Sequence, residues 1–337
     1  MQIPSLRHRR PLTPRRTGLV LLLLLGVLLV VSFLGLSIGS VAIPFSDVIG
    51  SCTGSSTVSE THRAILLTIR LPRIVLAIVV GAGLSTAGLV LQALLRNPLA
   101  EPYILGISSG GTVGAIVAIG LSLSPFLVPF ASFAGSALVM LLVYVIAHRR
   151  GRLDTNTLLL AGVMIGAFFN AAVLLLIALL NQELRNAFLW LMGNLSTAGA
   201  DSLVVVGPLV LIASLMFHSR AKSYNLIATG DESAMQLGVE VRSFKRASYL
   251  LASLITGLVV SVSGVVGFVG LIIPHVCRML WGPDHRLILP ASFLLGASFL
   301  VVADILARVL LAPTEIPVGA VTAAIGAPLF VYLLKKS

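Results

Sequence analysis

Apolar runs of about 20 residues recur along the whole of this 337-residue chain, and they leave little room for a soluble fold. A helix that crosses a membrane needs about 20 such residues, because each residue advances it by about 1.5 Å through a hydrocarbon core about 30 Å thick. Only 10% of the residues are charged. In lipid, backbone groups must find partners within helices or closed barrels. The pattern therefore predicts an all-α membrane protein.

Ten runs are predicted to be membrane spans. They cover residues 18–39, 65–95, 104–123, 126–147, 157–181, 203–218, 247–263, 265–281, 288–311 and 317–334. The stretch 247–281 could hold one long span or two short ones. Basic clusters on both sides of it require an even number of crossings, and Gly264, Gly267 and Gly270 permit a tight turn between two spans.

The N-terminal segment has the charge order of a signal peptide, since arginines precede an apolar run. That run exceeds the roughly 7–15 residues of a signal h-region, and no A-x-A-like site follows it. We interpret it as an uncleaved first span. The chain is thus expected to consist of a cytoplasmic tail, residues 1–17, and one transmembrane domain, residues 18–337.

The Lys and Arg residues are divided unequally between the two sides of the predicted membrane. Of 23, 18 lie on the side that carries both termini, which is expected to be cytoplasmic. The five exceptions are Arg63, Arg70, Arg73, Arg185 and Arg308. Snorkelling to the outer headgroups would explain Arg70 and Arg73. Arg308, at the outer end of the ninth span, favours the alternative, an acidic partner whose carboxylates these guanidiniums bind.

The sequence argues against several classes of function. The net charge of +11 comes without a basic patch interleaved with aromatic residues, so no nucleic acid partner is expected. None of the six His pairs with another at i, i+4, and the two Cys fall in different settings, so no metal or cofactor is expected. No catalytic constellation lies in the spans. Proton-coupled secondary transport is the second choice, but Asp304 is the one candidate carboxylate, and it is expected to pair with Arg308.

The largest polar segment, residues 220–246, lies between the sixth and seventh spans. It is long enough for two short helices separated by Gly230, the second opening on Asp231 and Glu232 and ending at Gly238. It is either an ordinary solvated loop or a docking element for a cytosolic motor. The chain has no G-x-x-x-x-G-K-[ST] motif, so a transporter built on it needs such a motor.

Polar residues near the fifth span are candidates for a translocation path. Asn170 and Asn181 could line a path for a polar ligand or bridge helices, and Arg185 lies at its outer mouth.

Several long motifs occur in an order typical of one family. They are RLPR, GAGLSTAGLVLQALLRNPLAEPYILGISSG, LLLAGV, ATGDESAMQLGV, GFVGLIIPHVCRML, DHRLILPASFLLGAS, ADILAR and EIPVGAVTAAIGAP. From about residue 60 to the C-terminus the chain resembles the permease subunits of the ATP-binding cassette (ABC) importers for cobalamin, haem and iron–siderophores. The resemblance implies the type II importer fold, with about ten helices, in the cytoplasmic membrane of a bacterium or archaeon.

The resemblance also implies partners and roles for particular residues. A second permease copy, a cytosolic ABC ATPase and an extracytoplasmic binding protein are expected. The binding protein would dock on Arg70, Arg73 and Arg308. The ATPase would couple through Thr229, Gly230, Asp231, Glu232, Ala234, Leu237 and Gly238. A cytoplasmic gate would be formed by Asn97, Pro98, Leu99, Asp154, Thr155 and Asn156. ATP hydrolysis would take place on the separate ATPase, so the chain itself is not expected to be an enzyme.

Overall fold

The structure, a computed structural model, describes residues 13–53, 58–149, 152–179, 184–196 and 200–336. Helices dominate these residues, and one hairpin of two-residue strands joins α6 to α7. The elements are α1 (Pro14–Ser37), α2 (Phe45–Thr53), α3 (Glu60–Ala64), the π-helix η1 (Ile65–Arg70), α4 (Leu71–Leu95), α5 (Ile107–Gly120), α6 (Leu127–Ala147), β1 (His148–Arg149), β2 (Arg152–Leu153), α7 (Thr155–Leu179), α8 (Leu184–Leu191), α9 (Ala200–Ser219), α10 (Ala221–Thr229), α11 (Asp231–Gln236), α12 (Val241–Ser263), α13 (Val269–Trp281), α14 (His285–Val309) and α15 (Val318–Lys336).

Seven helical segments in the described residues are long and apolar enough to cross a membrane. They are α1, the continuous run Glu60–Leu95, α6, α7, Ser202–Ser219 of α9, α12 and α14. Three shorter apolar helices, α5, α13 and Val318–Leu333 of α15, fall where the other three predicted spans lie. The predicted all-α membrane fold is confirmed, while ten complete crossings and the cytoplasmic position of both termini stay predictions.

Local chemistry sets several helix ends. Thr13 caps α1, since its hydroxyl accepts a hydrogen bond from the Arg16 N–H at 3.3 Å, and Pro14 occupies the first helical position. Asp154 caps α7 by accepting from the Thr157 N–H at 2.7 Å. At the end of α4, Arg96 adopts a left-handed conformation with φ 48°. Pro98 then prevents the helix from continuing.

Residues 247–281 form two helices joined by a turn, as predicted, although α12 has 23 residues and only α13 is short. The glycines of this region have different roles from those predicted. Gly264 takes φ 66° directly after α12, a conformation that glycine adopts without strain. Phe268, which is not a glycine, takes φ 69° before α13. Gly270 lies inside α13 instead of the turn, and there it packs against Gly88 of α4.

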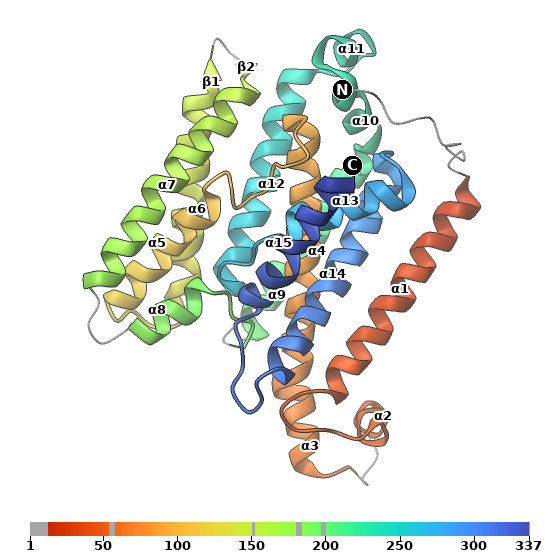
Figure 1. Cartoon of the computed structure of the whole chain (residues 1–337), viewed down its shortest axis with the longest axis vertical. Coiled ribbons are helices and arrows are strands. Elements are labelled where there is room, and N and C mark those ends of the chain that lie inside the picture. The colour runs from red at the N-terminus through yellow and green to blue at the C-terminus, as the bar shows by residue number, and fades with distance from the viewer. Residues whose placement is uncertain (1–12, 54–57, 150–151, 180–183, 197–199, 337) are drawn as a thin grey trace.

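Helix α4 is the centre of the bundle, and 20 of its 25 residues are buried. It runs between α12 and α14 and also contacts α9 and α13 (Figure 1). Small residues allow these backbones to meet: a Cβ on Gly81 would lie 2.2 Å from the Gly296 carbonyl oxygen of α14, and one on Gly88 would lie 2.1 Å from the Gly270 carbonyl oxygen. Such close contacts favour helix association in lipid.

The two ends of the bundle carry different elements. The β1–β2 hairpin, α10 and α11 lie at one end, at the top of Figure 1, which we name the α11 end. Helices α2 and α3 lie at the opposite end, named the α2 end (Figure 1). The predicted division of residues 220–246 into two short helices at Gly230 is confirmed, since α10 ends at Thr229 and α11 begins at Asp231.

The glycine contacts make a specific prediction for stability. Gly88→Ala should lower the free energy of unfolding by about 1–3 kcal/mol, because its Cβ would meet the Gly270 backbone and force α4 and α13 apart. Thermal unfolding of the purified protein in one detergent measures the effect. Gly18→Ala is the matched control, because nothing lies within 4 Å of a Cβ at this position in α1. Equal stability of the two variants would contradict the prediction.

Candidate functional site

A buried ion-pair cluster joins α4 and α14 at the α2 end. The Arg73 Nε donates to Asp304 Oδ1 at 2.7 Å, and Arg308 Nε lies 3.1 Å from Asp304 Oδ2. The side chains of Arg73, Asp304 and Arg308 are 7%, 1% and 4% exposed. The pairing of Asp304 with Arg308, predicted from their spacing, is confirmed. Arg73 is an additional partner of the same carboxylate.

The last turn of α1 and the residues just after it supply carbonyl acceptors for the arginines of this cluster. Arg70 donates to the carbonyl oxygens of Leu36 and Ser37, the second at 2.9 Å, and to that of Val41. Arg308 Nη2 donates to the Gly35 carbonyl at 3.1 Å. The end of a helix leaves carbonyl groups without intrahelical partners, and cations are favoured there. The arginines therefore fasten α1 to α4 and α14.

The three arginines predicted to dock a partner do lie close together, but their side chains are buried within the chain itself. Arg70 and Arg308 are each 4% exposed. Arg73 also donates to Glu315 Oε2 at 2.7 Å, and Glu315, at 40% exposure, is the accessible member of the cluster. Three guanidiniums meet two carboxylates, and Arg70 forms no ion pair with any described residue. The cluster keeps an excess of positive charge, while its contact with a partner stays a prediction.

At the α11 end, α11 presents an exposed and partly apolar surface. Ala234 is fully buried and anchors the helix, whereas Met235 and Leu237 are 47% and 65% exposed. Glu232 is exposed as well, and Thr229 hydrogen-bonds the Leu226 carbonyl at the end of α10. Gly238 follows α11 with φ 88° and open space beside it. Exposed large side chains on an ordered helix are typical of a protein-binding surface.

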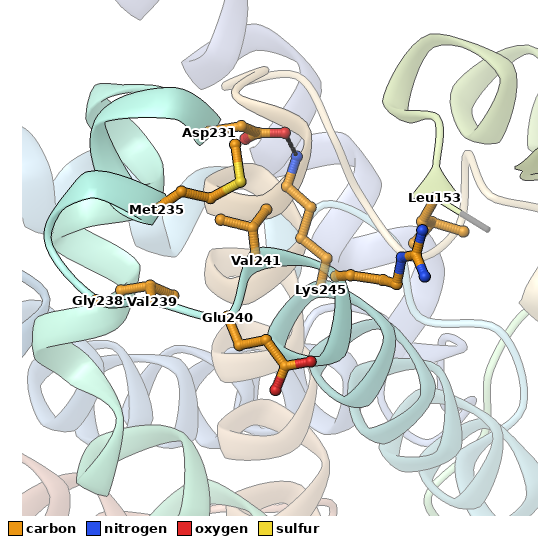
Figure 2. A pocket seen from close by; sticks show the side chains of 9 residues that line it. Leu153, Asp231, Met235, Gly238, Val239, Glu240, Val241 and Lys245 are labelled. Atoms are coloured by element: carbon orange, nitrogen blue, oxygen red, sulfur yellow. Dashed lines mark hydrogen bonds and ion pairs between the residues drawn. The ribbon is translucent and has the colours of Figure 1, made fainter. Parts of the chain in front are cut away.

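A hollow of about 530 Å³ lies beside α11, between it, the start of α12 and β2. Figure 2 shows Met235 and Val241 on its wall and the Asp231–Lys245 ion pair at one side. Lys245 Nζ donates to Asp231 Oδ2 at 2.6 Å, and the lysine side chain is only 4% exposed, so its charge is neutralised by a carboxylate where it is buried. Arg96, at the end of α4, lies 3.9 Å from the other oxygen of Asp231. The carboxylate thus joins α11 to both α12 and α4.

The two predicted gate motifs follow the end of α4 and open α7. Asn97 accepts from the Leu99 N–H at 2.9 Å, which shapes the turn, and Pro98 and Leu99 are exposed. The loop then folds back until Gly106 packs against α7 at Gly162 and Gly166. Asp154 caps α7, Thr155 is half-buried and Asn156 is exposed. Both motifs therefore lie on segments that contact one another, whereas their gating role stays a prediction.

Of the predicted path residues, Asn170 is described. It is exposed on α7 among apolar side chains, including Phe168, which is 70% exposed, and Leu174, which is 69% exposed. Asn181 lies outside the described residues, as does the side chain of Arg185 in α8. The described part of the chain contains no group of three His, Cys, Asp or Glu that could hold a metal ion.

Sequence reasoning missed a polar contact between α10 and the start of α14. Asn225 Oδ1 accepts from the backbone N–H of His285 at 2.8 Å and lies 2.7 Å from its Nδ1, and Asn225 Nδ2 donates to Asp284 Oδ1 at 2.8 Å. Burial raises the pKa of Asp284, but hydrogen bonds from Arg286 and Asn225 outweigh it and lower the pKa from 3.8 to about 2. The carboxylate stays ionised at physiological pH, and its contribution is lost only as the pH falls below about 4.

Glu101 was missed too. It lies buried in the loop between α4 and α5 and accepts from the Phe268 N–H at 2.6 Å. Neither this contact nor those of Asn225 have a signal in the sequence, since the partners are 59 or more residues away.

The buried cluster predicts unequal effects for its two carboxylates. Asp304→Asn should cost about 3–5 kcal/mol of stability, because Arg73 and Arg308 would stay buried without their shared carboxylate. Glu315→Gln, the matched control at the exposed edge, should cost only about 0.2–1 kcal/mol. Chemical unfolding in mixed micelles measures both. Similar losses in the two variants would contradict the burial of the Asp304 charge.

Comparison with known proteins identifies the family. Residues 27–336 match the model of the FecCD transport family. The chain is 45% identical over 279 residues to the cobalamin import system permease protein BtuC of Halobacterium salinarum, covering 82% of this chain and 75% of that one. It is 40% identical over 318 residues to the hemin transport system permease protein HmuU of Yersinia pestis, covering 92% and 93%.

A solved structure has the same fold. It is an inward-facing conformation of a metal-chelate type ABC transporter, 31% identical, with a TM-score of 0.83 over 95% of this chain and 100% of that one. ABC permeases are transport components that work with an ATPase, and they are not themselves enzymes. The chain is therefore a multi-pass membrane protein of the FecCD transport family, a permease subunit of an ABC importer.

Proposed function

We propose that this permease works as a homodimer in the cytoplasmic membrane of a bacterium or archaeon and imports a metal chelate of the cobalamin, haem or ferric siderophore class. An extracytoplasmic binding protein delivers the chelate to the α2 end, and a cytosolic ATPase binds the α11 end. The observation that carries this proposal is the contrast between the two ends. The α11 end carries the paired short helices α10 and α11, followed by Leu237 at 65% exposure, whereas the buried cluster of three guanidiniums and two carboxylates lies at the α2 end.

The charge of the cluster supports an acidic binding protein. Glu315 is the exposed ion-pair partner of Arg73, so the cluster is accessible from outside at this edge, and an acidic partner would be attracted by the excess positive charge of the cluster as a whole. Each exposed ion pair contributes little, but several complementary pairs orient and accelerate association. The snorkelling explanation is less favoured, because the guanidiniums of Arg70 and Arg308 donate to the α1 carbonyls.

The exposed face of α7 supports a second copy. Asn170 would contact lipid in an isolated protomer, where its amide would lack hydrogen-bond partners. A dimer that encloses this face would place Asn170 along a solvated path between the protomers. Most soluble homo-oligomers are closed and symmetric, and two-fold dimers are the commonest, so the same symmetry is expected here. Such a dimer offers two equivalent α2 ends to a two-lobed binding protein.

The class of ligand follows from the relatives. The relatives quoted above are named for cobalamin and hemin import, and others that are 35% identical to this chain are named for import of Fe(3+)-citrate and iron(3+)-hydroxamate. All of these ligands are compounds in which a metal ion is held by a larger organic ligand. Asn170 and the gate residues Asn97 and Asn156 would offer such a compound uncharged polar groups.

The α11 surface predicts the site of ATPase binding. Leu237→Ser should reduce the amount of ATPase that copurifies with the permease severalfold, because Leu237 is 65% exposed and would lose its apolar contact with the partner. Leu311→Ser is the matched control: it is the same change at a residue that is 62% exposed, at the α2 end. Because ATP is cytosolic, a loss of copurifying ATPase in Leu237→Ser alone would also assign the α11 end to the cytoplasm. Loss in Leu311→Ser alone would reverse that assignment.

Transport in proteoliposomes tests the function as a whole. The permease is reconstituted with its ATPase and binding protein, and uptake of cobalamin, hemin and a ferric siderophore is measured separately. We expect ATP-dependent uptake of one class only, abolished when the binding protein is omitted. Uptake that follows a proton gradient and ignores ATP would support the secondary transporter instead, and ATP-dependent uptake of none of the three would refute the proposed ligand class.

A further inference from the structure

Side chains of the segment that carries α10 and α11 contact the ends of α4 and α14 as well as α12. Asn225 of α10 makes hydrogen bonds to Asp284 and His285, which cap and begin α14. Asp231 of α11 lies 3.9 Å from Arg96, which ends α4. A Cβ on Gly230, between α10 and α11, would lie 3.8 Å from the same Arg96. The segment therefore touches the ends of α4 and α14 at the α11 end.

Helices α4 and α14 form a close antiparallel pair along their length. Gly81 and Gly296 bring the two backbones together, and the Ser85 hydroxyl donates to the Ser292 carbonyl at 2.7 Å. At the far end, Arg73 and Asp304 join them again at 2.7 Å. With 25 residues each, both helices extend about 37 Å, which exceeds the hydrocarbon thickness of a bilayer. Both helices are continuous from the α11 segment to the arginine cluster, although Pro290 removes one backbone hydrogen bond from the second turn of α14.

We infer that the α4–α14 pair transmits the state of the ATPase to the binding-protein side, and that Asn225 is the positioning residue at its start. The amide nitrogen of Asn225 donates to Asp284, the N-cap of α14, and its amide oxygen accepts from His285, the first residue, so a displacement of α10 moves that end of the helix. Packed elements have few alternative arrangements and transmit such shifts over distance. The Arg96–Asp231 pair is longer and half-exposed, so it is the weaker of the two connections.

This inference rests on the proposed function, because it needs both partners. Coupling between two sites is reciprocal: if the binding protein alters nucleotide affinity, nucleotide alters binding-protein affinity by the same factor. A residue that transmits the coupling changes this factor. A residue that only stabilises the fold changes the yield or the melting temperature and leaves the factor as it is.

The test compares two adjacent residues of α10 in the reconstituted complex. Asn225→Ala removes the contacts with α14, whereas Tyr224→Phe removes only the hydrogen bond from the Tyr224 hydroxyl to Ser248 of α12, 2.8 Å long. Two ratios are measured: the affinity for a non-hydrolysable ATP analogue with and without binding protein, and the binding-protein affinity with and without that analogue. We expect both ratios to fall at least threefold toward 1 in Asn225→Ala and to stay within a factor of two of wild type in Tyr224→Phe.

Unchanged ratios in Asn225→Ala, or an equal fall in Tyr224→Phe, would overturn the inference. If Asn225→Ala folds poorly, Asn225→Asp replaces it. Aspartate still accepts from His285 but cannot donate to Asp284, and it adds a second negative charge beside that carboxylate, so a fall in both ratios is again expected. Failure of the proposed function is distinguishable, since wild-type permease would then show no response to the binding protein at all.

Discussion

Close contact between helix backbones at glycines is the interaction on which the rest of this structure depends. Lipid tails are as apolar as leucine, so the hydrophobic effect does not hold helices together within the bilayer. Packing and hydrogen bonds must do so, and both require short distances. At Gly81 and Gly296, and again at Gly88 and Gly270, α4 meets α14 and α13 so closely that a single Cβ would not fit. This places α4 at the centre and fixes the positions of both of its ends.

The polar groups at those ends are positioned by that packing. Asp304 lies where two guanidiniums reach it, one from its own helix and one from α4, so a buried carboxylate becomes compatible with an apolar bundle. At the opposite end, Asp231 plays a similar part between Arg96 and Lys245, with more access to water. Both ends thus combine charges from different helices, and both lie where a partner protein is proposed to bind.

Much of the fold could be predicted from the sequence, because the length of an apolar run and the residues that begin and end a helix are local properties. The run lengths predicted the long helices, and Gly230 and Gly238 predicted the limits of α11. The burial of Arg70, Arg73 and Arg308 could not be predicted, since it depends on the α1 carbonyls and on Glu315, which are distant in sequence. The spacing of Asp304 and Arg308 predicted their pair but gave no sign of Arg73. Asn225 and Glu101 likewise acquire partners only through the tertiary fold.

The short helices α5 and α13 have a consequence for how the protein is made. With 14 and 13 residues they extend about 20 Å, less than the hydrocarbon core, and the loop before each is folded into the protein, where Glu101 binds the Phe268 N–H. Helices of this length do not partition into lipid by themselves, and the irregular backbone beside them needs protein around it. They must therefore enter the membrane together with the longer helices that follow and contact them, α6 and α14. Biogenesis of this permease is then a cooperative event in which hairpins, and not single helices, are the inserted units.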